Sequence, residues 1–193
     1  MAQPNLLEVD WSKIPAPTDD GGAAHLTGMA MPPVSLLATD DTTVDLSTLK
    51  GRTVVFGYPR TGEPGKIALV DDWDMIPGAR GCTPQTCSFR DLFAELKAAG
   101  AAHVFGLSTQ SNAYQTEMAS RLHLPFPVLS DEKLELARAL KLPTMEVAGL
   151  VLIKRIAVII DDARIRHVFY PVFPPDRNAA DVLEWLKDNP VKP

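Results

Sequence analysis

The most informative stretch of the 193-residue sequence is GCTPQTCSFRD, residues 81–91, which contains both of its cysteines. Thr83 is a residue type favoured at a helix N-cap, and Pro84 suits the first helical position. Gly100 is a typical helix stop. Between them, apolar residues recur at helical spacing: Phe89, Leu92, Phe93 and Leu96. The pattern predicts one amphipathic helix over residues 84–99.

Cys82 precedes this helix, where unpaired backbone N–H groups and the helix dipole favour an anion such as a thiolate. The dipole contributes about 0.3 to 2 kcal/mol. Lowering a thiol pKa from about 8.5 to about 6 needs roughly 3.4 kcal/mol, so a cation must help. Arg80 and Arg90 are near in sequence. Arg155 interrupts an apolar strand, where its burial would be costly without a partner for the charge.

Cys87 lies five positions after Cys82. In an intact α-helix this spacing gives a rise of about 7.5 Å and a turn of about 140°, which places the two Cα atoms roughly 8 to 9 Å apart. A disulfide cannot close over that distance. Bond formation between these cysteines would therefore require the first turns of the helix to unwind.

Other roles for the two cysteines stay open at this point. Cysteine is among the most buried residue types, so Cys87 could be an inert core residue. A zinc site would need two further ligands, and the histidines show no paired spacing. A Cys–His nucleophile is possible in principle because its members need not be close in sequence. The four histidines are His25, His103, His123 and His167.

Strand patterns alternate with helix patterns along most of the chain. This order predicts an α/β fold with a central mixed β-sheet and helices on both faces. Residues 1–33 show no sustained period and predict an extended N-terminal arm, while residues 34–193 form the domain. The stretch from Arg60 to Gly81 resists assignment. The expected strands are 43–46, 53–58, 102–107, 126–129, 156–160 and 165–169, and the remaining helices are 111–122, 130–140 and 176–187.

Composition excludes several classes of protein. Hydrophobic residues make up 46% of the chain and charged residues 22%, as in ordinary globular domains. The net charge of -5 and the absence of a basic run argue against a nucleic-acid partner. The longest apolar segment, 147–160, is interrupted by Lys154 and Arg155 and is too short to span a membrane. The N-terminus lacks a signal-peptide pattern, so we expect a cytoplasmic protein.

Five segments together resemble the peroxiredoxins of the alkyl hydroperoxide reductase/thiol-specific antioxidant (AhpC/TSA) superfamily. The resemblance covers about residues 33–186 and is strongest to the bacterioferritin-comigratory, or Q-type, branch, in which a resolving cysteine follows the peroxidatic one by five residues. Two cysteines at this spacing would by themselves be weak evidence, but all five segments occur in the order found in the family, which makes the resemblance specific. The five segments are TVVFGYP (53–59), GCTPQTCSFRD (81–91), FGLSTQS (105–111), LPFPVLSD (124–131) and RIAVIID (155–161).

The resemblance implies a thioredoxin-like fold and a thiol-dependent peroxidase. Cys82 matches the peroxidatic cysteine, which a peroxide oxidises to a sulfenic acid. Cys87 matches the resolving cysteine, and a thioredoxin-like protein would reduce the Cys82–Cys87 disulfide. Arg155 matches the family's active-site arginine, which stabilises the thiolate and holds the peroxide oxygens. The resemblance implies no metal and no organic cofactor, and a monomer or a homodimer.

The sequence departs from the family before Cys82. The family has a proline seven residues and a Thr or Ser three residues before the peroxidatic cysteine, where this chain has Met75 and Ala79. Pro59 follows its strand as expected, so we infer an insertion at about residues 60–80. Thr61 could fold back to supply the missing hydroxyl, or it could be an ordinary turn residue. Trp73 could cover the pocket or simply pack within the loop.

Two competing functions remain from the sequence alone. The chain could be a thioredoxin-like dithiol oxidoreductase or redox sensor, in which the Cys82–Cys87 pair passes oxidation to a partner. It could also be a binding module without enzymatic activity, in which the insertion and the N-terminal arm bind a partner and the thiols are incidental.

Overall fold

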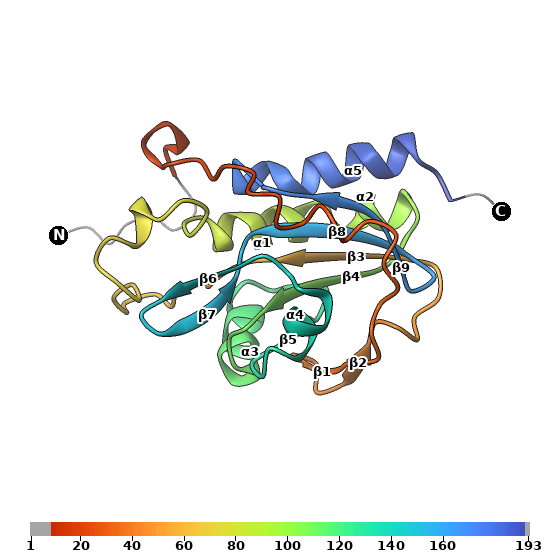
Figure 1. Ribbon diagram of the computed structural model, residues 1–193, viewed down its shortest axis with the longest axis horizontal. Helices are drawn as coiled ribbons and strands as arrows, with labels where there is room; N and C mark the ends of the chain where they lie inside the picture. Colours follow the sequence, from red (N-terminus) through yellow and green to blue (C-terminus); the bar gives the residue numbers. More distant parts are fainter. Residues whose placement is uncertain (1–8, 192–193) are drawn as a thin grey trace.

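The computed structural model describes residues 9–191 and has a mixed sheet at its centre (Figure 1). The seven strands lie in the order β2-β1-β5-β4-β3-β8-β9. The three neighbours β3, β4 and β5 are parallel, and β1 and β8 flank them in the antiparallel direction. The edge strands β2 and β9 pair antiparallel with β1 and β8, so they run in the same direction as the central three. The strands are β1 (Ser35–Ala38), β2 (Thr43–Asp45), β3 (Arg52–Gly57), β4 (Ala101–Ser108), β5 (Val128–Ser130), β8 (Ile156–Asp161) and β9 (Arg164–Phe169).

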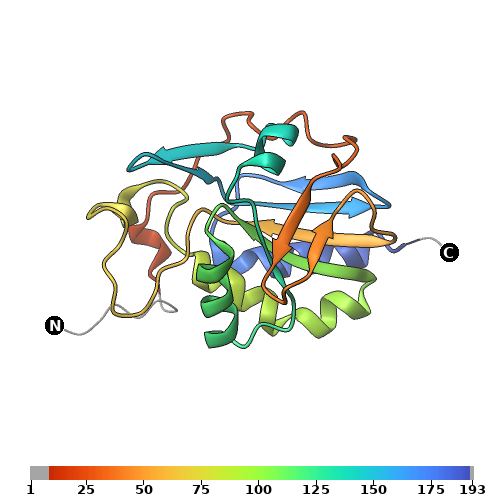
Figure 2. The same ribbon diagram turned by 90° about the horizontal axis from the view of Figure 1, so that it is seen from below.

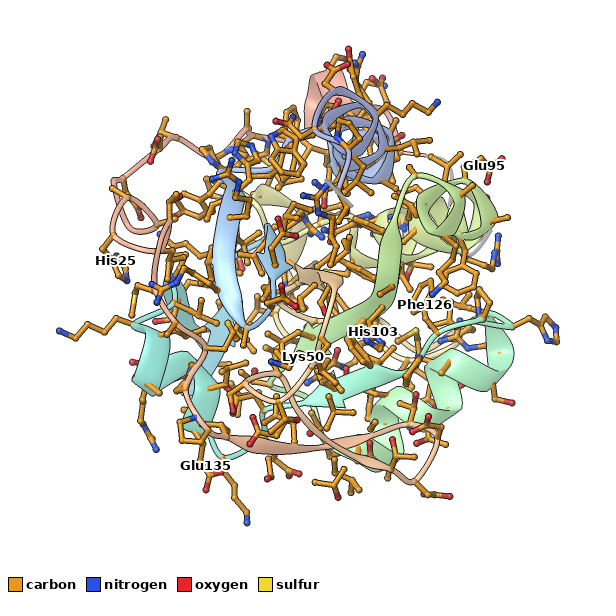
Figure 3. All side chains as sticks on the ribbon, turned by 90° about the vertical axis from the view of Figure 1, so that its right-hand side faces the viewer. His25, Lys50, Glu95, His103, Phe126 and Glu135 are labelled. Atoms are coloured by element: carbon orange, nitrogen blue, oxygen red, sulfur yellow. The ribbon has the colours of Figure 1, made fainter. Side chains whose placement is uncertain are left out.

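Helices cover both faces of this sheet, which confirms the predicted thioredoxin-like α/β class. One face packs against α1, α2, α5 and the inner side of α3, and the other against α4. In Figure 3, Glu95 of α2 and Glu135 of α4 accordingly lie on opposite sides of the molecule. The α-helices are α1 (Cys82–Asp91), α2 (Phe93–Ala98), α3 (Asn112–Arg121), α4 (Glu135–Leu140) and α5 (Asn178–Asp188), with short 3-10 turns η1 (Trp11–Lys13), η2 (Trp73–Met75) and η3 (Pro175–Arg177).

Strand β3 is buried along its whole length because it lies between β4 and β8 and has packed layers above and below it. Side chains alternate between the faces of a strand. Val54 and Phe56 therefore join the core under α1 and α5, whereas Val55 joins the core on the opposite face. The strand ends at Gly57, and Arg60 and Thr61, which follow it, line the same pocket as Cys82 at the start of α1.

The helix that carries the cysteines differs from the prediction. It begins at Cys82, with Gly81 rather than Thr83 as its N-cap, and it ends at Asp91. Leu92 leaves the helical conformation before α2 starts, so the predicted single helix is two helices. Gly81 has a φ of +103°, a left-handed conformation that glycine adopts without strain. This turn sets the direction in which the chain enters α1.

The insertion packs against a hairpin that was not predicted from the sequence. Strands β6 (Thr144–Val147) and β7 (Leu150–Ile153) form a separate two-stranded sheet. Trp73 and Ala79 of the insertion form a small buried cluster with Val147 and Leu152 of this hairpin. The insertion therefore has an apolar core of its own at one end of the main sheet, in yellow in Figures 1 and 2.

The described part of the N-terminal arm runs over the domain. Ala23, Leu26 and Met31 are buried in the main core, and Ala30 forms a bridge with Arg164 of β9. Residues 1–8 of the predicted arm lie outside the described residues. Figure 2 shows η1 beside the insertion, at the end of the sheet where α1 begins. From residue 9 to residue 191, no helix is long and apolar enough to cross a membrane.

Candidate active site

Cys82 is the first residue of α1, and its sulfur lies beside the guanidinium group of Arg155. Nη2 of Arg155 is 3.3 Å from Sγ, within hydrogen-bond range of sulfur. Both side chains are buried. A thiol at this position can donate to the carbonyl oxygen of Ala79 at 3.5 Å, whereas a thiolate would accept from Arg155. The sulfur therefore lies beside two sources of positive charge, the helix start and the buried guanidinium group.

Backbone carbonyls at the end of the insertion hold the arginine. Nη2 of Arg155 donates to the carbonyl oxygens of Gly78 at 3.1 Å, Ala79 at 3.2 Å and Arg80 at 3.0 Å. Three carbonyl dipoles therefore surround a charge whose burial would otherwise be costly. Arg80 and Arg90, the other two cations near Cys82 in sequence, each pair with a carboxylate. Arg80 forms an ion pair with Asp74, and Arg90 with Asp91.

Gln85 holds the second terminal nitrogen of Arg155, Nη1. Its role was not predicted from the sequence. Its Oε1 accepts a 2.6 Å hydrogen bond from Nη1 of Arg155, and its Nε2 donates to Oδ1 of Asn178 at 2.9 Å. All three side chains are almost completely buried. A polar residue one helical turn after Cys82, on the side that the helix buries, is the sequence signal that could have identified it.

Cys87 lies in the core beneath α1 and contacts no part of the open pocket above Cys82. Burial raises the pKa of its thiol, and the nearby positive charge of Arg90 only partly opposes this effect. Both cysteines are free thiols, and α1 is continuous between them. In this structure α1 is intact, and the two cysteines on it are too far apart to form a disulfide.

Thr61 lines the same pocket as Cys82, but its hydroxyl group donates to Gln110 Oε1 at 3.2 Å. The backbone N–H of Thr61 donates to the same oxygen at 2.9 Å. Its proposed hydrogen bond to sulfur therefore stays a prediction. Pro59 is buried where β3 ends, and its carbonyl oxygen accepts a hydrogen bond from Ser108.

Tyr58 lies next to Pro59 and is completely buried. Burial raises the pKa of its phenol well above the usual value, and the charge of the Cys82 thiolate raises it further. The hydroxyl group donates to Gln115 Oε1 at 3.0 Å. Tyr58 thus remains neutral and supports the floor of the site.

Above Cys82 lies an open pocket of about 460 Å³. The start of α1 forms one side, α3 contributes Tyr114, and the insertion forms the rest. Trp73 packs in the cluster with the β6–β7 hairpin, as expected of a packing residue, and it also lines this pocket. Within residues 9–191, no three His, Cys, Asp or Glu side chains gather as ligands for a metal ion.

A thioredoxin-like sheet that presents a helix-start cysteine to a buried arginine defines a class of thiol-based redox proteins. The chain belongs to the Redoxin family, whose model matches residues 26–183. Among curated proteins, it is 29% identical over 161 residues to the chloroplastic peroxiredoxin Q of Oryza sativa subsp. japonica, covering 83% of this chain and 66% of that protein. It is equally identical to the chloroplastic peroxiredoxin Q of Sedum lineare, covering 77% of that protein.

Solved structures support the same assignment. The peroxidoxin BcpB of Mycobacterium tuberculosis superposes with a TM-score of 0.68 at 26% identity, over 86% of this chain and 98% of that one. Peroxiredoxin Q of Xanthomonas campestris gives a TM-score of 0.64 at 22% identity, over 81% and 90% of the two chains, and supports the fold alone.

These comparisons confirm the resemblance to Q-type peroxiredoxins of the AhpC/TSA superfamily. They also correct one expectation. The cytoplasmic location predicted from the N-terminus is wrong by this measure, because the curated relatives are named as chloroplastic proteins. The match covers 66% of the length of the two rice relatives.

Proposed function

We propose that the protein is a thiol-dependent peroxidase that reduces hydrogen peroxide or organic hydroperoxides. The observation that carries this proposal is the 3.3 Å contact between Arg155 and the sulfur of Cys82, at a helix start and on the floor of an open pocket. Family membership and the peroxiredoxin Q relatives agree with it. The residues proposed to act are Cys82, Cys87 and Arg155, with Pro59 and Thr61 shaping the pocket.

In the first step the Cys82 thiolate attacks one oxygen of the peroxide, and the O–O bond breaks. A new S–O bond forms, so Cys82 becomes a sulfenic acid, and the second oxygen leaves with a proton as water or an alcohol. Arg155 stabilises the thiolate, and its planar fork can donate to the charge that develops on the leaving oxygen.

In the second step the sulfur of Cys87 attacks the sulfenic sulfur, hydroxide leaves as water, and a disulfide forms. The helix must open first, because the spacing of Cys82 and Cys87 on an intact helix is too wide for a disulfide. The start of α1 is held closed by hydrogen bonds from Thr86 Oγ1 to the carbonyl oxygen of Cys82 and from the Gln85 N–H to that of Gly81. Opening also brings Cys87 out of the core, which removes the burial that raises its pKa.

In the third step a dithiol protein of the thioredoxin type reduces the disulfide through a mixed disulfide and takes up the oxidising equivalents. Both electrons of the cycle come from thiols. The cycle is complete within one chain and needs no metal or organic cofactor, so it proceeds equally in a monomer or in a homodimer.

A coupled assay with hydrogen peroxide, thioredoxin, thioredoxin reductase and NADPH tests the proposal. We expect peroxide-dependent NADPH oxidation that Cys82→Ser abolishes. Cys87→Ser should form a sulfenic acid on Cys82, detectable with a dimedone probe, without turning over with thioredoxin. Ser88→Ala is the matched control on the same helix, because its hydroxyl bonds only the backbone of α1 and lies outside the pocket. It should retain activity.

The same assay separates the alternatives. Slow peroxide consumption combined with rapid oxidation of a protein partner would replace the peroxidase by a dithiol relay. Absence of peroxidase activity in the native protein, together with partner binding that survives loss of both cysteines, would replace both redox functions by a binding module.

A further inference from the structure

The insertion turns the space above Cys82 into a pocket far larger than hydrogen peroxide needs. We propose that residues 60–80 form a subsite for an organic hydroperoxide that carries a carboxylate, and that Arg60 binds this carboxylate. The inference rests on the proposed peroxidase function and names a substrate class for it. The apolar body of the substrate would lie against the side chains of the insertion, and its peroxide group would lie at Cys82.

Size is the first argument. The pocket measures about 460 Å³, whereas a water molecule occupies about 30 Å³ of liquid. A peroxide of two oxygen atoms would therefore leave most of the pocket filled with solvent. A hydroperoxide with a hydrocarbon body would displace this water, and burial of its apolar surface contributes about 25 cal/mol per Å².

The wall of the pocket suits such a body. The insertion contributes Ile67, Ala68, Leu69 and Trp73 to the lining, and α1 contributes Pro84. Ile67 is 97% exposed, although isoleucine is usually among the most buried residue types. An apolar side chain left in water at the rim of an open pocket would be covered by the hydrocarbon part of a bound substrate.

Charge is the second argument. Lys66 of the lining pairs with Glu63 at 2.7 Å, and Arg80 pairs with Asp74 at 3.3 Å. Arg60 has no carboxylate partner among the described residues, and its guanidinium group lies over the ring of Tyr114, 5.1 Å from the centroid. The lining thus presents one positive charge without a counter-ion, which is the complement of an anionic group on the substrate.

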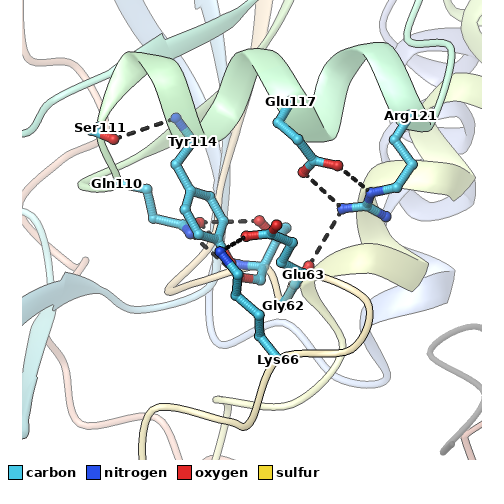
Figure 4. Close-up of polar contacts among 9 residues, drawn as sticks. Gly62, Glu63, Lys66, Gln110, Ser111, Tyr114, Glu117 and Arg121 are labelled. Atoms are coloured by element: carbon cyan, nitrogen blue, oxygen red, sulfur yellow. Dashed lines mark hydrogen bonds and ion pairs between the residues drawn. The ribbon is translucent and has the colours of Figure 1, made fainter.

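The backbone that follows Arg60 is anchored to α3 (Figure 4). Tyr114 donates its hydroxyl to the carbonyl oxygen of Thr61 at 3.0 Å, and Arg121 donates to that of Gly62 at 3.4 Å. On the other side Arg60 follows Pro59 at the end of β3. The backbone on both sides of Arg60 is therefore positioned, and the ring of Tyr114 supports its guanidinium group, which limits the freedom that the side chain loses when it binds an anion.

The test uses two probes that differ only in charge, linoleic acid hydroperoxide and its methyl ester, each below its micelle-forming concentration. Turnover is followed with thioredoxin, its reductase and NADPH. We expect the native protein to have the higher kcat/KM for the acid. Arg60→Gln should lower the acid-to-ester ratio of kcat/KM about fivefold, the size expected of a part-exposed ion pair. Arg60→Lys, which keeps the charge, should restore most of the ratio.

Two controls complete the design. Arg138→Gln removes a positive charge from α4, outside the pocket, and should leave the acid-to-ester ratio at its native value. Ile67→Ser should lower kcat/KM for both probes by a similar factor, because it removes apolar contact and no charge. Circular dichroism of each variant verifies that it is folded.

The outcomes are distinct. A native protein that reduces hydrogen peroxide with Cys82 but treats acid and ester alike, with a ratio that Arg60→Gln leaves unchanged, overturns this inference and keeps the peroxidase function. A native protein that reduces no peroxide at all overturns both. A ratio that falls in Arg60→Gln and also in Arg138→Gln would show a general charge effect and overturn the role of Arg60.

Discussion

At the scale of single residues, Arg155 is defined by the five groups that surround its guanidinium group. Its two terminal nitrogens contact three backbone carbonyls, the amide of Gln85 and the sulfur of Cys82. A guanidinium group satisfies these partners because it is a planar fork with several fixed donors. An ammonium group has one nitrogen and cannot reach both Gln85 and the carbonyls at once.

The first prediction concerns Arg155→Lys. We expect the rate of Cys82 oxidation by hydrogen peroxide to fall roughly 10- to 100-fold, because charged hydrogen bonds worth about 1.5 to 3 kcal/mol are lost. Stopped-flow tryptophan fluorescence, or competition with a peroxidase of known rate, measures this step. Thermal unfolding of the reduced variant is the control for folding. A rate within twofold of native would contradict the proposed role.

The second prediction concerns the ionisation of Cys87, tested in Cys82→Ser so that a single thiol remains. Burial raises the pKa of Cys87 in the folded protein, so above its unfolded-state pKa the unfolded chain loses a proton that the folded chain keeps. Stability should therefore be unaffected at neutral pH and fall as the pH rises above about 8.5. Urea unfolding from pH 7 to 10, with the variant lacking both cysteines as reference, measures this slope. Equal slopes in the two variants would contradict it.

At the scale of elements, the start of α1 is closed by a residue of the N-terminal arm. A Cβ atom on Gly81 would lie 2.6 Å from Trp11 Cη2 and 2.6 Å from Pro175 Cγ, so both rings contact the glycine directly. Trp11 is held by a 2.9 Å hydrogen bond from its indole N–H to Asp176 and by an edge-to-face contact with Phe173. The turn that must unwind during the cycle is thus covered by a ring from a distant part of the chain.

The third prediction is that Trp11→Ala speeds disulfide formation a few-fold after peroxide treatment, because the helix start loses a restraint. The same variant should form less sulfinic acid on Cys82 at high peroxide concentration, since the sulfenic acid is resolved sooner. Mass spectrometry of rapidly alkylated samples measures both products. Trp11→Phe, which keeps a ring but lacks the N–H donor, should lie between native and alanine. Unchanged disulfide rates in both variants would show that Trp11 does not restrain the helix.

The elements show what the sequence could and could not predict. Strand β3 and the last helix were predictable because their apolar patterns are local and strong. The helix break at Leu92 was not, because Phe89, Leu92 and Leu96 keep helical spacing across it. The β6–β7 hairpin was also missed, because its partner is an insertion whose packing depends on contacts distant in sequence.

The site shows the same division. The motif around Cys82 and the interrupted strand of Arg155 identified two side chains that the fold brings within 3.3 Å. Gln85 and Asn178 escaped notice because a buried amide is recognised only through its partners. Thr61 was placed near the pocket from its distance to Pro59, but the competing acceptor Gln110 lies 49 positions further along the chain.

At the scale of the whole molecule, the described part of the N-terminal arm contributes to the main core. Leu26 is completely buried and Met31 nearly so, in the same cluster as β4, β8 and α4. A chain beginning at residue 34 would leave this apolar surface exposed to water.

The fourth prediction follows from this packing. Leu26→Ala should lower the free energy of unfolding by about 2 to 5 kcal/mol, the usual cost of removing a fully buried leucine side chain. Urea denaturation of the reduced protein measures it. Ile67→Ala is the matched control, since Ile67 is 97% exposed and its change should cost less than about 0.5 kcal/mol. A similar cost at both positions would mean that the arm is not part of the cooperative unit.

The three carbonyls that hold Arg155 have an evolutionary consequence. Gly78, Ala79 and Arg80 bind the guanidinium group through main-chain atoms that every amino acid possesses. At Ala79 and Arg80, selection for this contact therefore acts on the path of the backbone more than on the side chains, whereas Gly78 has a φ of +81°, which favours glycine. The insertion could diverge widely in sequence while it preserves the same cradle for the arginine, as long as its last turn keeps its shape. A Thr or Ser at the position of Ala79, as the family has, offers the same carbonyl oxygen, so the arginine is held with or without the hydroxyl.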